Sequence, residues 1–165
     1  MADTLTETPV DLHGLRATLE SSRQFFARST DVLTDEHSGF APVEGLMTTV
    51  SQVAHVAHTL DWFAEGMQSP EGFDMDFEKH TKKIMAVTSL TEARAWVDRA
   101  FDAFLQLLDE KDAAFWSTPM AEGPVMGGQP RQSVIGAIAD HTAHHRGVLT
   151  VYSRLQGLVP TMPYM

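Results

Sequence analysis

Apolar residues recur at three- and four-residue intervals over four long segments of the chain, and this spacing predicts four amphipathic helices. The first predicted helix covers about residues 10–33 and the second about 45–67, followed by a third over 89–108 and a last over 131–155. A weaker helical pattern spans residues 78–87, between the second and third long helices. No segment shows the sustained two-residue alternation of a half-buried strand. The pattern predicts an all-α fold.

Turn-forming residues separate these segments. Gly39 and Pro42 follow the first predicted helix, and either Ser89 or Thr91 can cap the third. Residues 117–130 hold three prolines and three glycines, which predicts a long loop before the last helix, with a small hairpin at its tip. We therefore expect an antiparallel four-helix bundle of the up-down-down-up type. Residues 1–165 are expected to form one domain, with residues 1–8 flexible.

Composition and charge restrict the class of partner. Lysine and arginine number 12 against 22 acidic residues, so the formal net charge is −10. Such a chain repels a phosphate backbone, and its one basic run, residues 79–83, is short and flanked by acids. We expect no binding to nucleic acid or to an anionic membrane. There is neither a run of eighteen apolar residues nor the pattern of a signal peptide, so a cytoplasmic location is expected.

Histidine is the residue type that suggests chemistry. The chain has no cysteine and eight histidines, so a bound metal would need histidine, carboxylate or water as ligands. On a helical wheel, His141 and His145 fall near the centre of the apolar stripe of the last helix, with Val134, Ile138 and Tyr152. Histidines four residues apart lie one above the other and can share one ion. The alternative is a pair of core histidines, each satisfied by its own hydrogen bond.

A third ligand is expected from a facing helix, where His55 and His58 are the candidates. Both lie off the main apolar stripe of the second predicted helix, His55 somewhat less so, and either alone is explained as a half-exposed histidine. His144 lies at the edge of the last stripe. The remaining three, His13, His37 and His80, have no partner at metal-binding spacing. The residues alone therefore leave the third ligand open.

Two runs of residues carry a family resemblance. Residues 53–63 (VAHVAHTLDWF) place His55 seven positions before the aromatic pair Trp62-Phe63. Residues 140–147 (DHTAHHRG) are followed by 152–157 (YSRLQG) and by a tail containing proline and tyrosine, Pro160 to Tyr164. Together these runs resemble the second and closing helices of the DinB-like (YfiT-like) superfamily of four-helix-bundle metalloproteins.

The resemblance implies a metal site with the ligands His55, His141 and His145. It also implies one divalent ion per site, zinc or nickel, and a homodimer. Some relatives are similar to metal-dependent transferases that activate a low-molecular-weight thiol such as mycothiol, bacillithiol or glutathione for attack on an electrophilic small molecule. The function expected on this basis is a metal-dependent thiol S-transferase. The alternatives are a metal-dependent hydrolase and a non-catalytic metal- or ligand-binding stress-response protein.

Five further side chains are expected to support the site. Asp61 or Asp140 could accept a hydrogen bond from a ligand imidazole, although a solvated surface carboxylate is the simpler explanation of each. Arg146 could hold a substrate carboxylate or pair with an acid across the bundle. Trp62 could border the pocket or belong to the core. His58 falls where the family does not require histidine, so it would at most contact the ligand residues without binding the metal itself.

Overall fold

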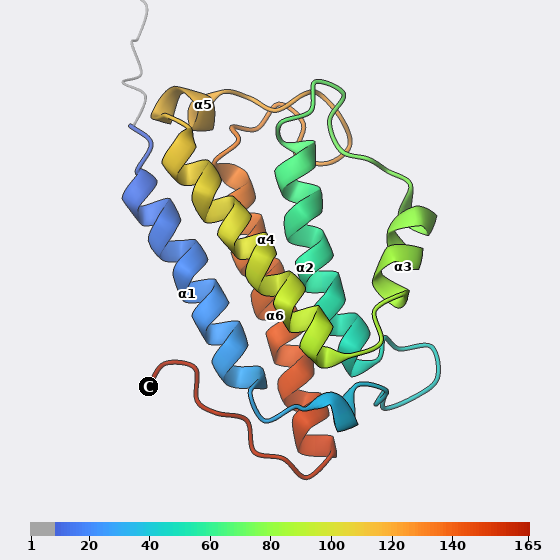
Figure 1. Ribbon diagram of the computed structural model, residues 1–165. Helices are drawn as coiled ribbons and strands as arrows, with labels where there is room; N and C mark the ends of the chain where they lie inside the picture. Colours follow the sequence, from blue (N-terminus) through green and yellow to red (C-terminus); the bar gives the residue numbers. More distant parts are fainter. Residues whose placement is uncertain (1–8) are drawn as a thin grey trace, which may run out of the picture.

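The expected bundle is present in the computed structural model, which describes residues 9–165 (Figure 1). Its four long helices are α1 (Leu12–Thr30), α2 (Thr49–Gly66), α4 (Leu90–Glu110) and α6 (Ser133–Leu155). Shorter helical segments are η1 (Asp35–His37), α3 (Phe77–Met85) and α5 (Ala113–Ser117). No strand occurs within the described residues, which confirms the all-α prediction. The expected flexibility of residues 1–8 lies outside the described part of the chain.

The long helices follow the up-down-down-up order. In Figure 1, α1 and α6 run downwards, whereas α2 and α4 run upwards. The closest pairs are the two parallel ones, α2 with α4 and α1 with α6, and α2 also packs against α6. Because α2 and α4 are parallel, the chain must cross the length of the bundle between them, and α3 lies in this crossing. The topology thus gives α2 three neighbours: α3, α4 and α6.

Side-chain caps set where the long helices begin. Asp11, Thr48 and Ser89 each accept a hydrogen bond from the backbone N–H three residues later. These bonds satisfy donors that a helix leaves free in its first turn. Of the two caps considered for α4, Ser89 is the one used. After the C-terminal end of α6, Gly157 has a φ of +78°, a left-handed conformation that glycine adopts without strain.

The core is continuous through the bundle and is dominated by aromatic and aliphatic side chains. The largest fully buried ones are Trp116, Phe101, Phe104, Leu19 and Leu60. Trp116 comes from α5, a five-residue helix within a region where the sequence predicts only the approach to a loop. The expected hairpin there is reduced to a single antiparallel bridge between Pro119 and Pro130.

In the described part of the chain, no helix is long and apolar enough to cross a membrane.

The buried face of α6 differs slightly from the predicted stripe. Val134, Ile138, His145 and Tyr152 are buried as expected, but Leu155 is 60% exposed and His141 is only half-buried. The centre of the face includes Thr142 and Leu149 instead. The reason is that α6 contacts two helices, α1 and α2, which lie on different sides of it. Its histidines point to one neighbour and Thr142 to the other.

Candidate metal centre

Three histidine rings converge between α2 and α6. His55 comes from the middle of α2, and His141 and His145 lie one turn apart on α6. The Nε2 atom of His141 is 3.2 Å from Nε2 of His55 and 3.2 Å from Nε2 of His145. One ring nitrogen from each residue lies within 4.8 Å of the others. The structure therefore assembles the three side chains that the family resemblance implied as ligands.

The two separations of 3.2 Å match those between ligands of one ion. Nitrogen ligands about 2.0–2.1 Å from a tetrahedral zinc ion are separated from one another by about 3.3 Å. Hydrogen bonding alone explains the cluster poorly, because a neutral imidazole has one donor and one acceptor and here three ring nitrogens meet at a point. A divalent cation would satisfy all three lone pairs together. The position facing the pocket described below would stay open for a further ligand.

Burial keeps these histidines neutral, which is the form that binds a metal. It lowers the pKa of His141 to about 4 and the pKa of His145 to about 3, with smaller contributions from the neighbouring histidines. The pKa of His55 is also lowered, again mainly by burial. At neutral pH all three rings present unprotonated nitrogens. The site therefore needs no proton release from the histidines before it can bind an ion.

Gln52 determines which nitrogen of His145 faces the cluster. The Nδ1 atom of His145 lies 2.5 Å from Oε1 of Gln52, so Nδ1–H donates to the amide oxygen. This tautomer leaves the Nε2 lone pair free for the site. Gln52 is one turn before His55 on α2 and is itself buried. In contrast, Nδ1 of His55 is buried without a partner among the described residues, so the tautomer of His55 is set at its Nε2 side, where the cluster lies.

Replacing Gln52 with leucine is expected to weaken zinc binding about ten- to a hundredfold, because partners that orient a ligand histidine have effects of this size. Leucine fills a similar volume but accepts no hydrogen bond. The measurement is competition for zinc against a chromophoric chelator. Gln68→Leu is the matched control, since Gln68 is exposed just after α2. Equal affinities of Gln52→Leu and the wild type would contradict the orienting role.

A pocket of about 270 Å³ adjoins the histidine cluster and lies beneath α3. His55 and His141 line its inner side, together with the hydroxyl-bearing Thr59, whose Oγ1 is 3.4 Å from Nε2 of His141. The other walls are mostly apolar and aromatic: Met47, Trp62, Phe63, Phe77 and Ile84. In the part of the chain that the structure describes, no carboxylate is among the lining residues. The pocket suits the apolar part of a small molecule whose reacting atom faces the three histidines.

Of the supporting residues expected from the sequence, two lie at this pocket. Trp62 borders it and donates a hydrogen bond from its indole N–H to the backbone of Asp74. His58 lines the same pocket and packs against His80 of α3, with the ring centres 4.7 Å apart. Burial, followed by the effects of His80 and Lys83, lowers the pKa of His58 to about 4. His58 is a wall of the pocket and is not part of the three-nitrogen cluster.

The other three expected residues are placed elsewhere. Asp61 accepts a hydrogen bond from the indole N–H of Trp96 at 2.7 Å, so its carboxylate positions a tryptophan. Asp140 is exposed on α6. Arg146 lies in a different pocket, between α1 and α6. The structure shows no contact of these residues with the histidine cluster.

Sequence reasoning missed Gln52, Thr59 and His80. Gln52 precedes His55 by three positions, so a search for polar residues on the same helical face as a proposed ligand could have found it. Thr59 follows His55 by four positions and could have been found in the same way. His80 reaches the pocket only because α3 folds back over α2, and no local pattern in the sequence indicates this contact.

Three imidazole nitrogens converge in the core of this up-down-down-up helical bundle and could together hold one metal ion. The comparisons with known proteins identify the family to which this bundle belongs. The family model of the DinB superfamily matches residues 18–149, and the chain belongs to this superfamily. No curated protein matches the sequence significantly.

Solved structures share the fold. A DinB-like protein from Bacillus cereus ATCC 10987 superposes with a TM-score of 0.72 at 22% identity, over 93% of this chain and 96% of that one. YfiT from Bacillus subtilis superposes with a TM-score of 0.70 at 16% identity, over 94% of both chains. YfiT is described as a probable metal-dependent hydrolase with an unusual four-helix bundle topology. At these identities the likeness shows the shared fold.

Proposed function

We propose that this protein is a metal-dependent enzyme that activates a small thiol for attack on an apolar electrophile. The observation that carries the proposal is the convergence of three Nε2 atoms beside an apolar pocket, which two of the three histidines, His55 and His141, also line. Three neutral protein ligands leave a coordination position open, which is typical of catalytic metal sites. The description of YfiT as probably metal-dependent supports a functional metal in this fold.

The ion would be zinc or nickel, because imidazole nitrogen is a good ligand for both and no thiolate is available. When bound, a divalent cation lowers the pKa of a coordinated thiol or water enough to make it nucleophilic near neutral pH. His55, His141 and His145 would hold the ion, and Gln52 would hold His145 in the required tautomer. Trp62, Phe63 and Phe77 would bind the electrophile and exclude water from it.

The overall reaction balances as a substitution. The thiol releases its proton to solvent, and its sulfur forms a bond to an electrophilic carbon of the substrate. The bond from that carbon to the leaving group breaks, and the leaving group departs with the electron pair. Thr59, whose hydroxyl lies beside His141, is placed to donate a hydrogen bond to a group entering this end of the pocket.

Hydrolysis is the second candidate, favoured by the description of YfiT. Metal-dependent hydrolases of the zinc-protease type use a carboxylate as general base beside the metal. Among residues 9–165, no carboxylate lines this pocket, and the residue after His141 is threonine. A thiol needs less assistance than water, because coordination to the cation is sufficient to deprotonate it. The composition of the pocket therefore favours a thiol as the nucleophile.

The test compares both reactions on one preparation. Protein loaded with zinc or nickel would be assayed with a panel of small thiols and 1-chloro-2,4-dinitrobenzene, and separately with p-nitrophenyl acetate without thiol. We expect thiol-dependent turnover that is lost in His141→Ala and kept in His144→Ala. In Trp62→Ala the KM for the aromatic substrate should rise severalfold while the metal content stays unchanged. Ester hydrolysis without thiol transfer would identify a hydrolase, and no turnover of either substrate at full metal loading would favour a binding protein.

A further inference from the structure

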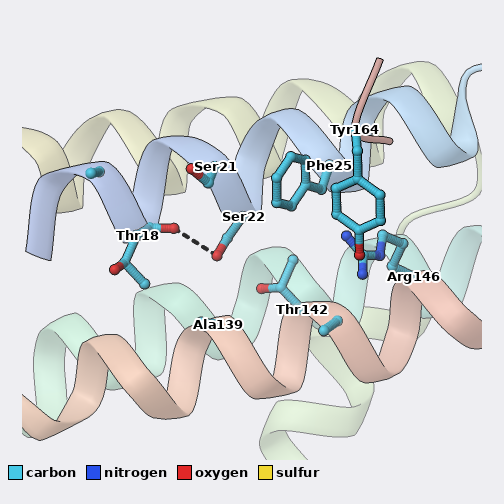
Figure 2. A pocket seen from close by; sticks show the side chains of 10 residues that line it. Thr18, Ser21, Ser22, Phe25, Ala139, Thr142, Arg146 and Tyr164 are labelled. Atoms are coloured by element: carbon cyan, nitrogen blue, oxygen red, sulfur yellow. Dashed lines mark hydrogen bonds between the residues drawn. The ribbon is translucent and has the colours of Figure 1, made fainter. Parts of the chain in front are cut away.

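A second pocket lies on another side of α6, between α6 and α1 (Figure 2). Its volume is about 460 Å³. Small side chains from both helices form its walls, and Phe25, Arg146 and Tyr164 close one end. Thr142 and Arg146 each follow a histidine of the metal centre by one position, which turns them by about 100° around the helix axis. The two pockets therefore open on different faces of α6.

Arg146 offers an unused cationic group at this pocket. Figure 2 shows its side chain reaching from α6 towards the rings of Phe25 and Tyr164. The guanidinium carbon lies 5.6 Å from the centre of the Phe25 ring and 5.9 Å from that of Tyr164. Within residues 9–165, no carboxylate lies within 4.0 Å of Arg146 and no hydrogen bond uses its N–H groups. The planar guanidinium thus lies beside a pair of aromatic rings, whose centres are 4.9 Å apart, with its donors unpaired among the described residues.

The free donors of Arg146 contrast with its surroundings. The chain carries 22 acidic residues, and on the neighbouring helix Arg16 and Arg23 are both paired with carboxylates of α4. An arginine that stays unpaired in so acidic a protein leaves its fork available to an external anion. Guanidinium matches carboxylate and phosphate equally well, because both present two oxygens to two parallel N–H groups.

Thr142 supplies a second, independent observation at the floor of the pocket. Its side chain is only 1% exposed, and its hydroxyl has no hydrogen-bond partner among the described residues. Helical threonine and serine hydroxyls commonly bond to the carbonyl four residues earlier. Thr18 and Ser22 on the opposite wall do so, at 2.9 and 2.8 Å, but Thr142 does not. A buried hydroxyl without a partner is costly, and this one lies just beneath the surface of the pocket.

We propose that this pocket binds a small organic anion, with a carboxylate or phosphate on the fork of Arg146 and its body along the groove above Thr142. The rings of Phe25 and Tyr164 hold the guanidinium in place and offer an apolar surface to the ligand. The small side chains of Ala139 and Ala143 leave room for it between the helices. This site is independent of the metal centre and of the reaction proposed there.

The test uses the full-length, zinc-loaded protein and three probes that differ in charge: benzoate, phenyl phosphate and neutral benzamide. Amide chemical shifts would locate the binding, and calorimetry would give its affinity. We expect at least one of the two anions to shift the resonances of residues 18–25 and 139–146. Benzamide should leave both sets of resonances unchanged. Binding of benzoate alone would identify carboxylates as the ligand class, and binding of phenyl phosphate alone would identify phosphate esters.

Variants separate this site from the rest of the surface. Arg146→Gln should weaken anion binding at least tenfold, because the amide cannot replace the charged, two-pronged guanidinium. Arg99→Gln, at an exposed arginine of α4, and His55→Ala at the metal centre should leave it unchanged. Circular dichroism would confirm that each variant is folded. The Arg146→Lys variant would keep the positive charge but lose the two parallel N–H groups of the guanidinium.

Three results would overturn the proposal. The first is equal binding of benzamide and the anions, which would reveal an apolar groove without charge recognition. The second is loss of anion binding in His55→Ala but not in Arg146→Gln, which would place the anion on the metal. The third is a dimer in sedimentation equilibrium that Ala143→Trp dissociates, because a second copy of the chain would then cover the groove.

Discussion

Alanine at His55, His141 or His145 is expected to remove the bound divalent ion from a protein that otherwise carries one per chain. Structural zinc sites bind with about 10–16 kcal/mol distributed over four ligands, so losing one ligand should weaken binding on the order of a hundred- to a thousandfold. Each of the three residues supplies one of the converging nitrogens, so the three variants should behave alike. Elemental analysis of untagged protein, followed by zinc and nickel titrations, measures the effect.

Two histidines serve as controls for this experiment. His144 is exposed on α6 and packs against His145, with the ring centres 4.9 Å apart, but contributes no nitrogen to the cluster. His58 lines the adjoining pocket and also lies outside the cluster. Both alanine variants should therefore keep one ion per chain. A folded wild type that contains no metal and refuses added zinc and nickel would contradict the metal centre, and the histidines would then be polar groups of the core.

The order and type of the long helices could be predicted because each carries a local signal. Apolar spacing marks the buried faces, and Ser89 marks the start of α4. The ends were less accurate where a distant residue decides them. The first helix was expected to continue to about Leu33, yet it ends at Thr30, where Arg94 of α4 donates hydrogen bonds to the carbonyls of Thr30 and Leu33. A contact between residues more than 60 positions apart leaves no periodic trace near either of them.

The site was predictable in part for a similar reason. The pair His141 and His145 follows from helical spacing, but periodicity placed His55 off the main stripe of its helix. In the structure α2 is buried on almost every side, with 13 of its 18 residues buried, because α3, α4 and α6 all pack against it. A helix with three neighbours has no single apolar stripe, so the face towards α6 could not be read from polarity. The family resemblance identified His55 where the periodicity did not.

Zinc affinity is expected to fall less than about fivefold between pH 6.5 and pH 5.5, the most that protonation of a single histidine with an ordinary pKa would cause. Three histidines with an ordinary pKa of about 6.5 would be mostly protonated at pH 5.5, and the affinity would fall on the order of a hundredfold over this interval. Here burial holds the pKa of His141 at about 4 and that of His145 at about 3, with His55 shifted in the same direction. Protons on His141 and His145 therefore compete with the metal only below this interval. Competition titrations at the two pH values measure the difference.

The same pKa shifts have the opposite consequence for folding of the metal-free protein. In the unfolded chain His141 and His145 take up protons near pH 6.5, whereas in the folded chain they do so only near pH 4 and pH 3. Stability is therefore complete above about pH 6.5 and falls as the pH is lowered towards 4. Urea midpoints of the metal-free protein should decrease over this range, and zinc should restore them because it binds only the folded state. A hundredfold loss of zinc affinity by pH 5.5, in protein that circular dichroism shows to be folded, would mean that the three rings are solvated and outside the core.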